Sequence, residues 1–225
     1  AVKGIVPEKK VLVGAYLAEN YNVNEALFGV IAGPCHAEEV ALERLSYLTL
    51  ASSNLALAEQ MKEKLGCNYI QVSLSKDVIG VEYAATLKNI YAIAVGIAHG
   101  LGYGDNFISV LISSAMREMK CFLKHIGKKK RNINNSAYLG DLLVTCYSIF
   151  SRNRMLGNMI GKGYTVKAAL MEMTMIAEGY YGAKTIYELS TSFNGEYPIL
   201  QFVYQVLYEK GSAKKKMRGL SKVLD

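Results

Sequence analysis

The pattern of hydrophobic and polar positions changes once along the chain, near residue 77. Before that point, apolar runs of strand length alternate with segments of helical spacing. Strands are predicted over residues 1–5, 27–32, 47–51 and 69–74, and helices over residues 11–20, 37–42 and 55–65. Such alternation predicts an α/β layer.

From residue 78 onward only helical spacing is found. A long helix is predicted over 78–99, a glycine-rich break over 100–106 and a second long helix over 107–125. Shorter helices are predicted over residues 138–146, 151–160, 166–172, 177–192 and 199–210. Asp77 is of the residue type that caps a helix N-terminus, so it is predicted to start the first long helix. This second part is predicted to be all-α.

The helix predicted over 78–99 carries a lysine, Lys88, in a run that is apolar on every face. A lysine in that position either extends its stem to water or has its ammonium group used by a ligand. Burial lowers the pKa of a lysine toward working pH, which suits a general acid or an anion-binding group. The neighbouring Asn89 and polar clusters at 140–146 and 151–154 favour a functional lysine.

Composition and charge limit the classes of function that this chain is expected to have. The 225 residues are 51% hydrophobic and 20% charged, which is ordinary for a soluble globular protein. The net charge is +7, but much of the excess lies in two short runs, 128–131 and 214–218, predicted to be solvated loops or tails. We therefore expect no nucleic-acid partner and no membrane span. The four cysteines and three histidines lack metal-ligand spacing, so free thiols and no metal are expected.

Three glycine-containing segments are candidates for nucleotide-binding turns. Residues 100–104 follow a helix rather than a strand, and residues 157–163 lack the spacing of a phosphate-binding loop. Gly33-Pro34 differs because it follows a predicted strand and precedes a predicted helix. That position would place backbone N–H groups at the carboxyl edge of a sheet, where anions dock. A simple strand-to-helix turn is the alternative.

Taken together, these motifs resemble one family, the NAD(P)-dependent glycerol-3-phosphate dehydrogenases, chiefly the bacterial type. The resemblance covers nearly the whole chain, and the matching motifs occur in the family's order. They are Lys3-Gly4-Ile5, Gly33-Pro34 with Ala37-Glu38-Glu39, Asp77 to Glu82, Leu87-Lys88-Asn89, Gly100 to Asn106, Gly140-Asp141-Leu142, Thr145-Cys146, Ser151 to Arg154 with Gly157, and Ala177-Glu178-Gly179.

The resemblance implies two domains. Residues 1–77 are expected to be the C-terminal part of a Rossmann-type NAD(P)-binding domain whose glycine-rich turn is missing, and residues 78–225 an all-helical substrate-binding and catalytic domain. Roughly 100 residues are expected to precede Ala1, so the chain as given is expected to be inactive. The implied enzyme is a cytoplasmic homodimer that uses NAD or NADP. It interconverts sn-glycerol 3-phosphate and dihydroxyacetone phosphate for phospholipid synthesis.

The resemblance also implies roles for individual residues. Lys88 is expected to be the general acid or base, with Asp141 orienting it. Substrate-binding residues are expected to be Lys3, Gly33, Cys35, Asn89, Thr145, Ser151, Arg152 and Asn153, and cofactor-binding residues Ala37, Arg152, Ile176 and Glu178. Cys35 and His36 stand where the family usually has Ser or Thr and an aromatic residue, so one substrate hydrogen bond is in doubt.

Several alternatives stay open on the residues alone. Lys88 could reach water through its stem, Arg152 could form a salt bridge at a helix start, and Asp141 could be an N-cap. The chain could instead belong to a related hydroxy-acid dehydrogenase, or be a non-catalytic helical binding or dimerisation module. The methionines and tyrosines between residues 171 and 181 could form core or a dimer contact, and core is expected.

Overall fold

The computed structural model describes residues 4–6, 8–127 and 129–224. Their contacts divide the chain into two compact units, which we describe separately. Unit 1 consists of Ala1–Thr86 and Arg131–Asp141, and unit 2 of Leu87–Lys130 and Leu142–Asp225. The predicted class, a short α/β part followed by a largely helical part, is confirmed.

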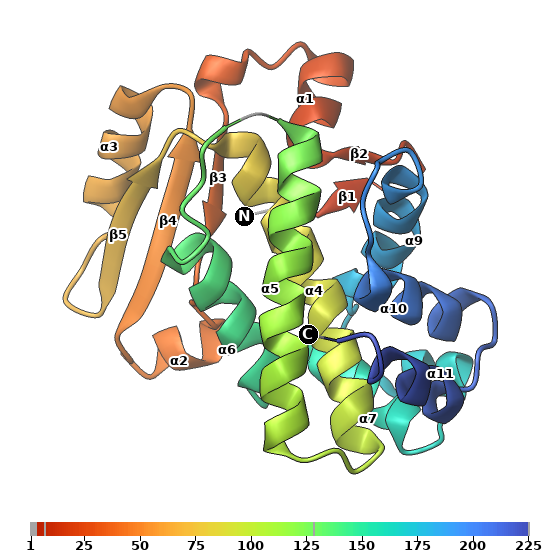
Figure 1. Ribbon diagram of the computed structural model, residues 1–225. Helices are drawn as coiled ribbons and strands as arrows, with labels where there is room; N and C mark the ends of the chain where they lie inside the picture. The colour runs from red at the N-terminus through yellow and green to blue at the C-terminus, as the bar shows by residue number, and fades with distance from the viewer. Residues whose placement is uncertain (1–3, 7, 128, 225) are drawn as a thin grey trace. The chain divides into compact units, whose positions relative to one another are not determined.

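The strands of unit 1 form two small sheets (Figure 1). The first pairs β1 (Ile5–Val6) with β2 (Val11–Leu12) in antiparallel fashion. The second has the order β3-β4-β5 and contains β3 (Gly29–Ala32), β4 (Ser46–Ser52) and β5 (Ile70–Ser75). Its helices are α1 (Val13–Tyr21), a 3-10 turn η1 (Glu25–Leu27), α2 (Ala37–Ala41) and α3 (Leu55–Leu65), of which α3 packs against β4 and β5.

The strands of the three-stranded sheet do not all run in the same direction, which bears on the expected place of Gly33 at a carboxyl edge. β4 and β5 are parallel, but β3 runs antiparallel to β4, with Ala32 opposite Thr49. The end of β3 therefore lies beside the first half of β4, and the expected common carboxyl edge at Gly33 is not formed. The predicted helix over 11–20 begins at Val13 because Val11 and Leu12 pair with β1. Residues 1–3 of the predicted first strand lie outside the described residues.

The helix that carries Lys88, α4 (Val78–Gly100), begins in unit 1 and continues into unit 2. Asp77 accepts a hydrogen bond from the Gly80 N–H at 3.3 Å, which confirms the predicted N-cap. α4 is long and apolar enough to cross a membrane by length and composition alone, but 83% of its apolar window is buried. That burial is typical of a core helix, and it confirms the expectation from its apolar faces.

Asp77 also corrects the interpretation of the first basic run. Arg131 was expected in a solvated loop, yet its side chain is 7% exposed and its Nε lies 2.6 Å from Asp77 Oδ2. The Tyr138 hydroxyl donates to the same carboxylate oxygen at 2.7 Å. Burial alone would raise the pKa of Asp77, but the hydrogen bonds from Arg131 and Tyr138 outweigh it and lower the pKa.

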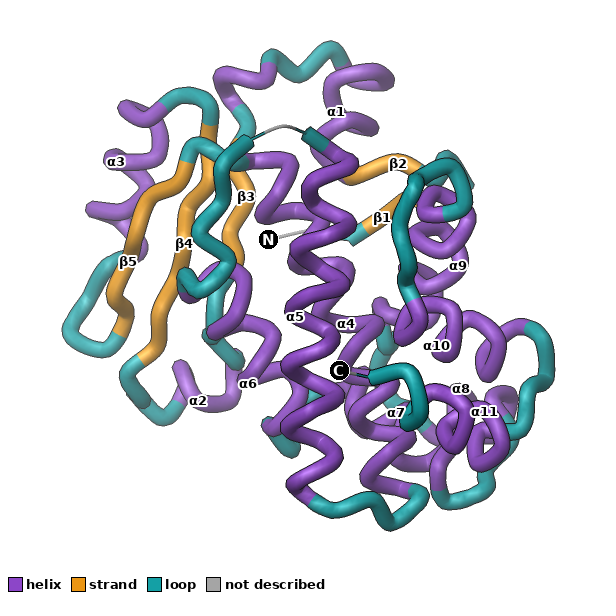
Figure 2. The backbone as a smooth tube through the Cα atoms, viewed as in Figure 1, coloured by secondary structure: helices purple, strands orange, loops and turns teal. Residues whose placement is uncertain are grey.

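Unit 2 is built from helices that Figure 2 shows in purple. Residues 136–140 of unit 1 form a π-helical turn, η2 (Ser136–Gly140), that leads into α6. The remaining helices are α5 (Asp105–Ile126), α6 (Asp141–Tyr147), α7 (Arg152–Gly161), α8 (Val166–Glu172), α9 (Glu178–Ser190), α10 (Pro198–Tyr208) and α11 (Ala213–Leu220).

The second basic run lies in α11, so its prediction as a loop or tail is wrong. Met217 and Leu220 of α11 are buried, at 0% and 5% exposure. Their spacing of three residues places them on one face of the helix, while Lys214, Lys215 and Arg218 stay exposed. The helix escaped prediction because only two apolar anchors mark its buried face.

α4 and α7 approach each other through four glycines. A Cβ on Gly96 would lie 2.1 Å from the Arg154 carbonyl oxygen, and one on Gly157 would lie 2.1 Å from the Ile93 carbonyl oxygen. Gly100 and Gly161 are in the same situation, at 2.3 Å from Asn158 O and 2.4 Å from Ile97 O. Only residues without a Cβ permit this backbone contact. We call these four positions the glycine seam.

Glu118 of α5 is 5% exposed and serves the N-terminus of α10. Its two carboxylate oxygens accept the N–H groups of Ile199 and Leu200 at 2.8 and 2.9 Å. These N–H groups belong to the first turn of α10 and have no partner within the helix. Burial nevertheless raises the pKa of Glu118 to about 8, although the two N–H groups and Tyr91 lower it.

None of the methionines and tyrosines between 171 and 181 is fully buried, so the expectation that they form core is wrong. Met171 is 76% exposed, Met175 is 60% exposed and Tyr181 is 47% exposed. The four cysteines are free, as expected, with Cys67 exposed and Cys146 buried.

Candidate active site

Lys88 and Asn89 are the centre of a polar cluster in unit 2. They lie on the part of α4 that is otherwise apolar, and they are only 7% and 8% exposed. Burying an ammonium group is costly unless other groups interact with it. The position fits the expectation of a functional lysine better than that of a lysine whose head reaches water.

Two helix N-termini meet beside Asn89. The Asn153 side-chain oxygen, in the first turn of α7, accepts the Gly179 N–H in the first turn of α9 at 2.9 Å. The Asn89 side-chain nitrogen lies 3.4 Å from Glu178 Oε2. A Cβ on Gly179 would lie 2.7 Å from the Asn89 carbonyl oxygen, so α9 begins in direct backbone contact with α4. Three helices thus join in one cluster.

Local sequence explains why α7 begins there. Ser151 is the N-cap of α7, and its hydroxyl accepts the Arg154 N–H at 3.3 Å. Ser151 and Asn153 are buried, at 3% and 7% exposure. The glycine seam holds the rest of α7 against α4. Capping and close packing together fix this N-terminus next to the Lys88 helix.

Cys146 of α6 is close enough to Lys88 and Arg154 to feel the charges of both. Burial raises the pKa of the Cys146 thiol to about 12, while the charges of Lys88 and Arg154 act in the opposite direction. Thr145, expected to bind substrate, is also buried, at 4% exposure. Arg154 was not among the expected site residues. Its place in the Ser151–Arg154 motif was the signal that could have identified it.

The expected phosphate and cofactor ligands of unit 2 are more accessible. Arg152, at the first position of α7, is exposed, and Ile176 is 64% exposed just before α9. Glu178 is half-buried, and its carboxylate accepts from Asn89. These three residues could contact a bound ligand without a change in the core.

The other expected site residues belong to unit 1. Asp141 is 1% exposed, and its Oδ2 accepts the Gly33 N–H at 3.1 Å. Gly33 has a φ of +115°, and a Cβ there would lie 2.6 Å from the Tyr47 carbonyl oxygen, which accounts for the glycine. Cys35 is half-buried and Ala37 is exposed at the start of α2. Lys3 lies outside the described residues.

The cluster in unit 2 is suited to an anion. The N-termini of α7 and α9 carry partial positive charge, although the Arg154 and Gly179 N–H groups already have side-chain partners. Lys88, Arg152 and Arg154 add three cationic side chains on α4 and α7. No group of three or more His, Cys, Asp or Glu residues in the described part of the chain could hold a metal ion.

Comparison with known proteins defines the class. Residues 77–218 match the family model described as NAD-dependent glycerol-3-phosphate dehydrogenase C-terminus, and residues 1–58 match the model of its N-terminus. The chain is 40% identical over 178 residues to glycerol-3-phosphate dehydrogenase [NAD(P)+] of Pelodictyon phaeoclathratiforme, covering 79% of this chain and 54% of the relative. A relative of the same name from Lacticaseibacillus paracasei is 36% identical, covering 99% of this chain and 64% of the relative.

A solved structure agrees with these relatives. The chain matches the crystal structure of glycerol-3-phosphate dehydrogenase from Coxiella burnetii with a TM-score of 0.91 and 31% identity, over 97% of this chain and 66% of that one. The class is therefore that of two-part dehydrogenases with an α/β part and a helical part. The chain belongs to the NAD-dependent glycerol-3-phosphate dehydrogenase family. It spans a little over half the length of the first curated relatives it matches.

Proposed function

We propose that this chain acts in the interconversion of sn-glycerol 3-phosphate and dihydroxyacetone phosphate, with NAD or NADP as the hydride carrier. The buried Lys88-Asn89 pair beside the N-termini of α7 and α9 carries the proposal. A phosphate monoester is a dianion at neutral pH, and such an anion is stabilised by helix N-termini and cationic side chains. The product would serve phospholipid synthesis.

Lys88 is proposed as the general acid and base. Reduction of a ketone leaves an alkoxide oxygen that must gain a proton, and the Lys88 ammonium group would supply it. In the reverse direction the neutral amine would accept the hydroxyl proton. Burial supports this role because the surrounding helix packing holds the side chain in a fixed position. Asp141 is proposed to orient Lys88, a role that rests on the family resemblance.

The substrate groups are assigned to polar side chains of the cluster and of unit 1. Arg152 can bind two phosphate oxygens with its planar guanidinium group. Asn89 can donate to or accept from the substrate hydroxyl groups. The other proposed substrate residues are Lys3, Gly33, Cys35, Thr145, Ser151 and Asn153.

A nicotinamide cofactor, when bound, would supply the hydride-transfer chemistry. Ala37, Arg152, Ile176 and Glu178 are proposed to contact it. The exposed Ile176 side chain could cover a planar ring, and the Glu178 carboxylate beside Asn89 could accept a hydrogen bond from an amide. These residues fit one end of such a cofactor, whereas the sequence contains no complete glycine-rich dinucleotide turn.

The remaining proposals follow from the family. Residues 1–77 would contribute to cofactor binding and residues 78–225 would form the substrate-binding and catalytic domain. The protein would work in the cytoplasm as a homodimer. The exposed apolar residues Met171 and Met175 offer one surface for such an assembly.

The function is tested by measuring dihydroxyacetone phosphate reduction with NADH and with NADPH, both for this chain, which is expected to be inactive alone, and for a longer form that carries a glycine-rich dinucleotide turn ahead of it, in which the variants are compared. Lys88→Ala should lower kcat by about 100-fold or more, since general acid catalysis contributes factors of that order. Arg152→Lys should instead raise KM by about tenfold or more, because a bidentate phosphate contact is lost while a positive charge remains.

Lys120→Ala, at an exposed position on α5 outside the cluster, is the matched control and should leave both constants unchanged. A Lys88→Ala protein that keeps its kcat would contradict the assignment of the acid. If the protein instead reduced a 2-keto carboxylate in preference to dihydroxyacetone phosphate, it would belong with the hydroxy-acid dehydrogenases.

A further inference from the structure

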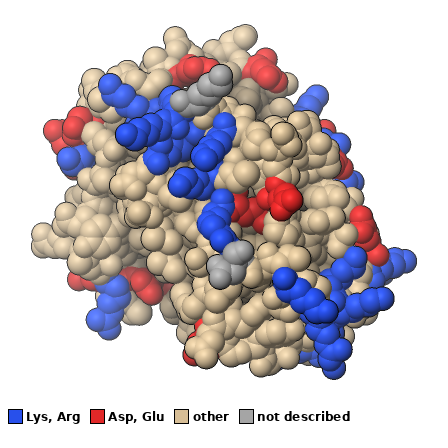
Figure 3. Space-filling model, viewed as in Figure 1, with Lys and Arg blue, Asp and Glu red and all other residues tan. Residues whose placement is uncertain are grey.

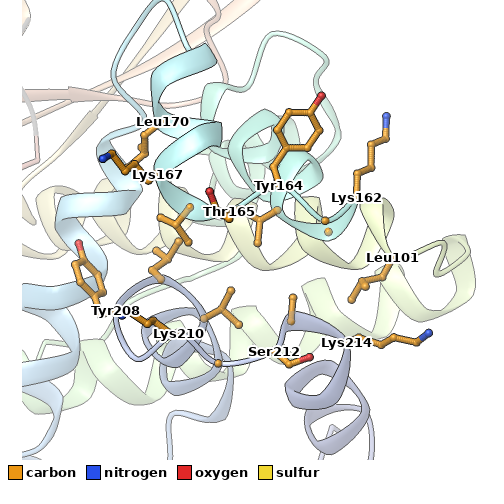
Figure 4. Close-up of a pocket in the computed structure, with 18 of the residues that line it drawn as sticks. Leu101, Lys162, Tyr164, Thr165, Lys167, Leu170, Tyr208, Lys210, Ser212 and Lys214 are labelled. Atoms are coloured by element: carbon orange, nitrogen blue, oxygen red, sulfur yellow. The ribbon is translucent and has the colours of Figure 1, made fainter.

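Unit 2 contains a second candidate site, a cavity of about 970 Å³ that lies apart from Lys88 (Figure 4). It is bounded by Leu101 just after α4, by residues 160–167 and 170 of α7, α8 and their connection, by Tyr180 of α9, and by residues 206–208 and 210–214 from the end of α10 to the start of α11. Its volume is in the upper range of small-molecule sites. Residues 88 and 101 are about 20 Å apart along the helix axis at the rise of an α-helix.

The inner wall of this cavity is apolar. Leu101, Val166 and Leu170 are half-buried, so each leaves part of its side chain accessible. Ile160, Val206 and Leu207 complete this wall. Apolar surface that lines an open cavity gains free energy when an apolar ligand covers it.

Four lysines surround the same cavity, and no acidic side chain is among its described lining residues. They are Lys162, Lys167, Lys210 and Lys214, and all four are exposed. Figure 4 shows Lys162 and Lys214 on either side of Leu101, with their amino groups extended away from the apolar wall. Figure 3 shows Lys and Arg residues gathered where α11 lies. Four like charges around one opening create a positive potential that attracts anions.

Two helices begin at the cavity. Thr165 and Ser212 cap α8 and α11 with their hydroxyl groups, which accept the N–H groups of Ala168 and Lys215. Their capping bonds fix the wall at two points. The Tyr208 side chain is fixed by a different hydrogen bond, which its hydroxyl donates to the Tyr180 carbonyl oxygen. The walls are therefore preformed, and binding would not require them to fold.

We propose that this cavity binds a single-chain amphiphile with an anionic head group. The alkyl chain would cover the apolar wall and the head group would lie among the lysines. Inorganic phosphate could satisfy the lysines but would leave the apolar wall in water, and a neutral amphiphile would leave the four ammonium groups without a counter-charge. This proposal does not depend on the proposed dehydrogenase activity.

Isothermal titration calorimetry with dodecyl phosphate below its critical micelle concentration tests the proposal. We expect saturable binding with one site, about 100-fold tighter than that of inorganic phosphate, because burial of several methylene groups contributes at least this factor. Dodecyl maltoside, with the same chain and a neutral head, should bind far more weakly. Equal affinity for dodecyl phosphate and inorganic phosphate, or for dodecyl phosphate and the maltoside, would overturn the proposal.

Charge reversal locates the site. The double variant Lys162→Glu/Lys214→Glu should weaken dodecyl phosphate binding about tenfold or more, as two ion pairs become repulsive contacts. The control Lys120→Glu/Lys124→Glu makes the same change in net charge at two exposed positions outside the cavity and should leave the affinity unchanged. Equal affinities of the two variants would refute the assignment.

A fluorescent reporter keeps the test independent of those variants. The chain contains no tryptophan, so Tyr164→Trp would place its single indole at the cavity. Its emission should shift to shorter wavelength on titration, with the affinity found by calorimetry. Tyr21→Trp, at an exposed position of α1, should not respond. If the Tyr164→Trp signal responds only to vesicles of phosphatidylglycerol and not to monomeric amphiphile, the proposed ligand is wrong.

Discussion

At the scale of single residues, Glu118 makes stability depend on pH. Its carboxyl group is buried against the N-terminus of α10, and its pKa is raised to about 8. Between the ordinary pKa near 4.5 and pH 8, the folded state keeps a proton that the unfolded state has lost. The free energy of unfolding must therefore decrease as the pH rises through this range.

We predict that Glu118→Gln removes this contribution. In wild-type protein the Glu118 contribution should reach about 1.4 kcal/mol per pH unit at most, the value for one linked proton. The measurement is urea unfolding at a series of pH values from 5 to 9. Glu209→Gln, at the exposed end of α10, should keep the wild-type slope, and an unchanged slope in Glu118→Gln would rule out the raised pKa.

The sequence identified important residues where a motif marks them. It could not identify residues whose importance depends only on their burial in the folded chain. Lys88 was identified as a lysine in an apolar helix and Asn153 and Glu178 through the family motifs, and their side chains do lie in or beside one cluster in unit 2. Whether they bind substrate or cofactor stays a prediction. Glu118 was missed because an acid next to Arg117 in a helix is typical of a solvated face, and its partners are 81 and 82 residues away.

At the scale of helices, the glycine seam between α4 and α7 holds the helix of Lys88 against the helix of Arg152. An added methyl group at Gly157 would collide with the backbone of α4, at 2.1 Å from Ile93 O and 2.9 Å from Ile97 N. Backbone atoms in two packed helices cannot move aside as the tip of a side chain can. The helices would have to separate.

We predict that Gly157→Ala lowers the free energy of unfolding by about 3 kcal/mol or more, in the upper range for overpacked cores. Gly219→Ala is the matched control, because a Cβ there meets nothing within 4 Å. It should stabilise α11 by up to about 1 kcal/mol through helix propensity. Urea denaturation of both variants gives the comparison, and similar midpoints would show that the seam tolerates a methyl group.

Helix limits followed from periodicity, but strand directions did not. The predicted boundaries of α4, α7 and α8 agree with the structure within two residues, since long apolar spacing and caps such as Asp77 and Ser151 mark them. The antiparallel direction of β3 leaves no mark on a four-residue apolar run. The π-helical turn before α6 was likewise invisible, because it depends on how residues 136–140 pack.

At the scale of the molecule, the chain crosses between the two units three times. The crossings fall between Thr86 and Leu87, between Lys130 and Arg131, and between Asp141 and Leu142. The segment 131–141 belongs to unit 1 through contacts distant in sequence. Arg131 and Tyr138 bind Asp77, and Asp141 binds the Gly33 N–H.

This topology predicts that a single cut between Lys130 and Arg131 does not release a fragment. Brief trypsin treatment that cleaves there should give two bands on a denaturing gel but one peak on size-exclusion chromatography. Arg131→Ala should weaken the retention of segment 131–141, seen as faster hydrogen exchange of that segment. Separation of the nicked wild-type chain into two peaks would contradict the contacts that join residues 1–130 to residues 131–225, the Asp77 contacts and the glycine seam among them.

The sequence pattern placed the change of architecture near residue 77, yet the contacts assign the first turns of α4 to unit 1. Periodicity could not show this, because one uninterrupted helix contributes to both units. The return of 131–141 to unit 1 was also hidden, since the Lys128–Arg131 run is indistinguishable from a solvated loop until Asp77 is placed beside it.

The different exposure of the cysteines allows one unit to be labelled selectively with a thiol-reactive dye. Cys67 is exposed on unit 1, whereas the thiol of Cys146 on unit 2 is buried and keeps its proton at any pH used for labelling. With the half-buried Cys35 and Cys121 replaced by Ala, a maleimide dye on Cys67 would report on the sheet-containing unit, while an indole at position 164 would report on the helical one. Recording the dye emission and the indole emission during one denaturation experiment would show whether the two units unfold together or in sequence.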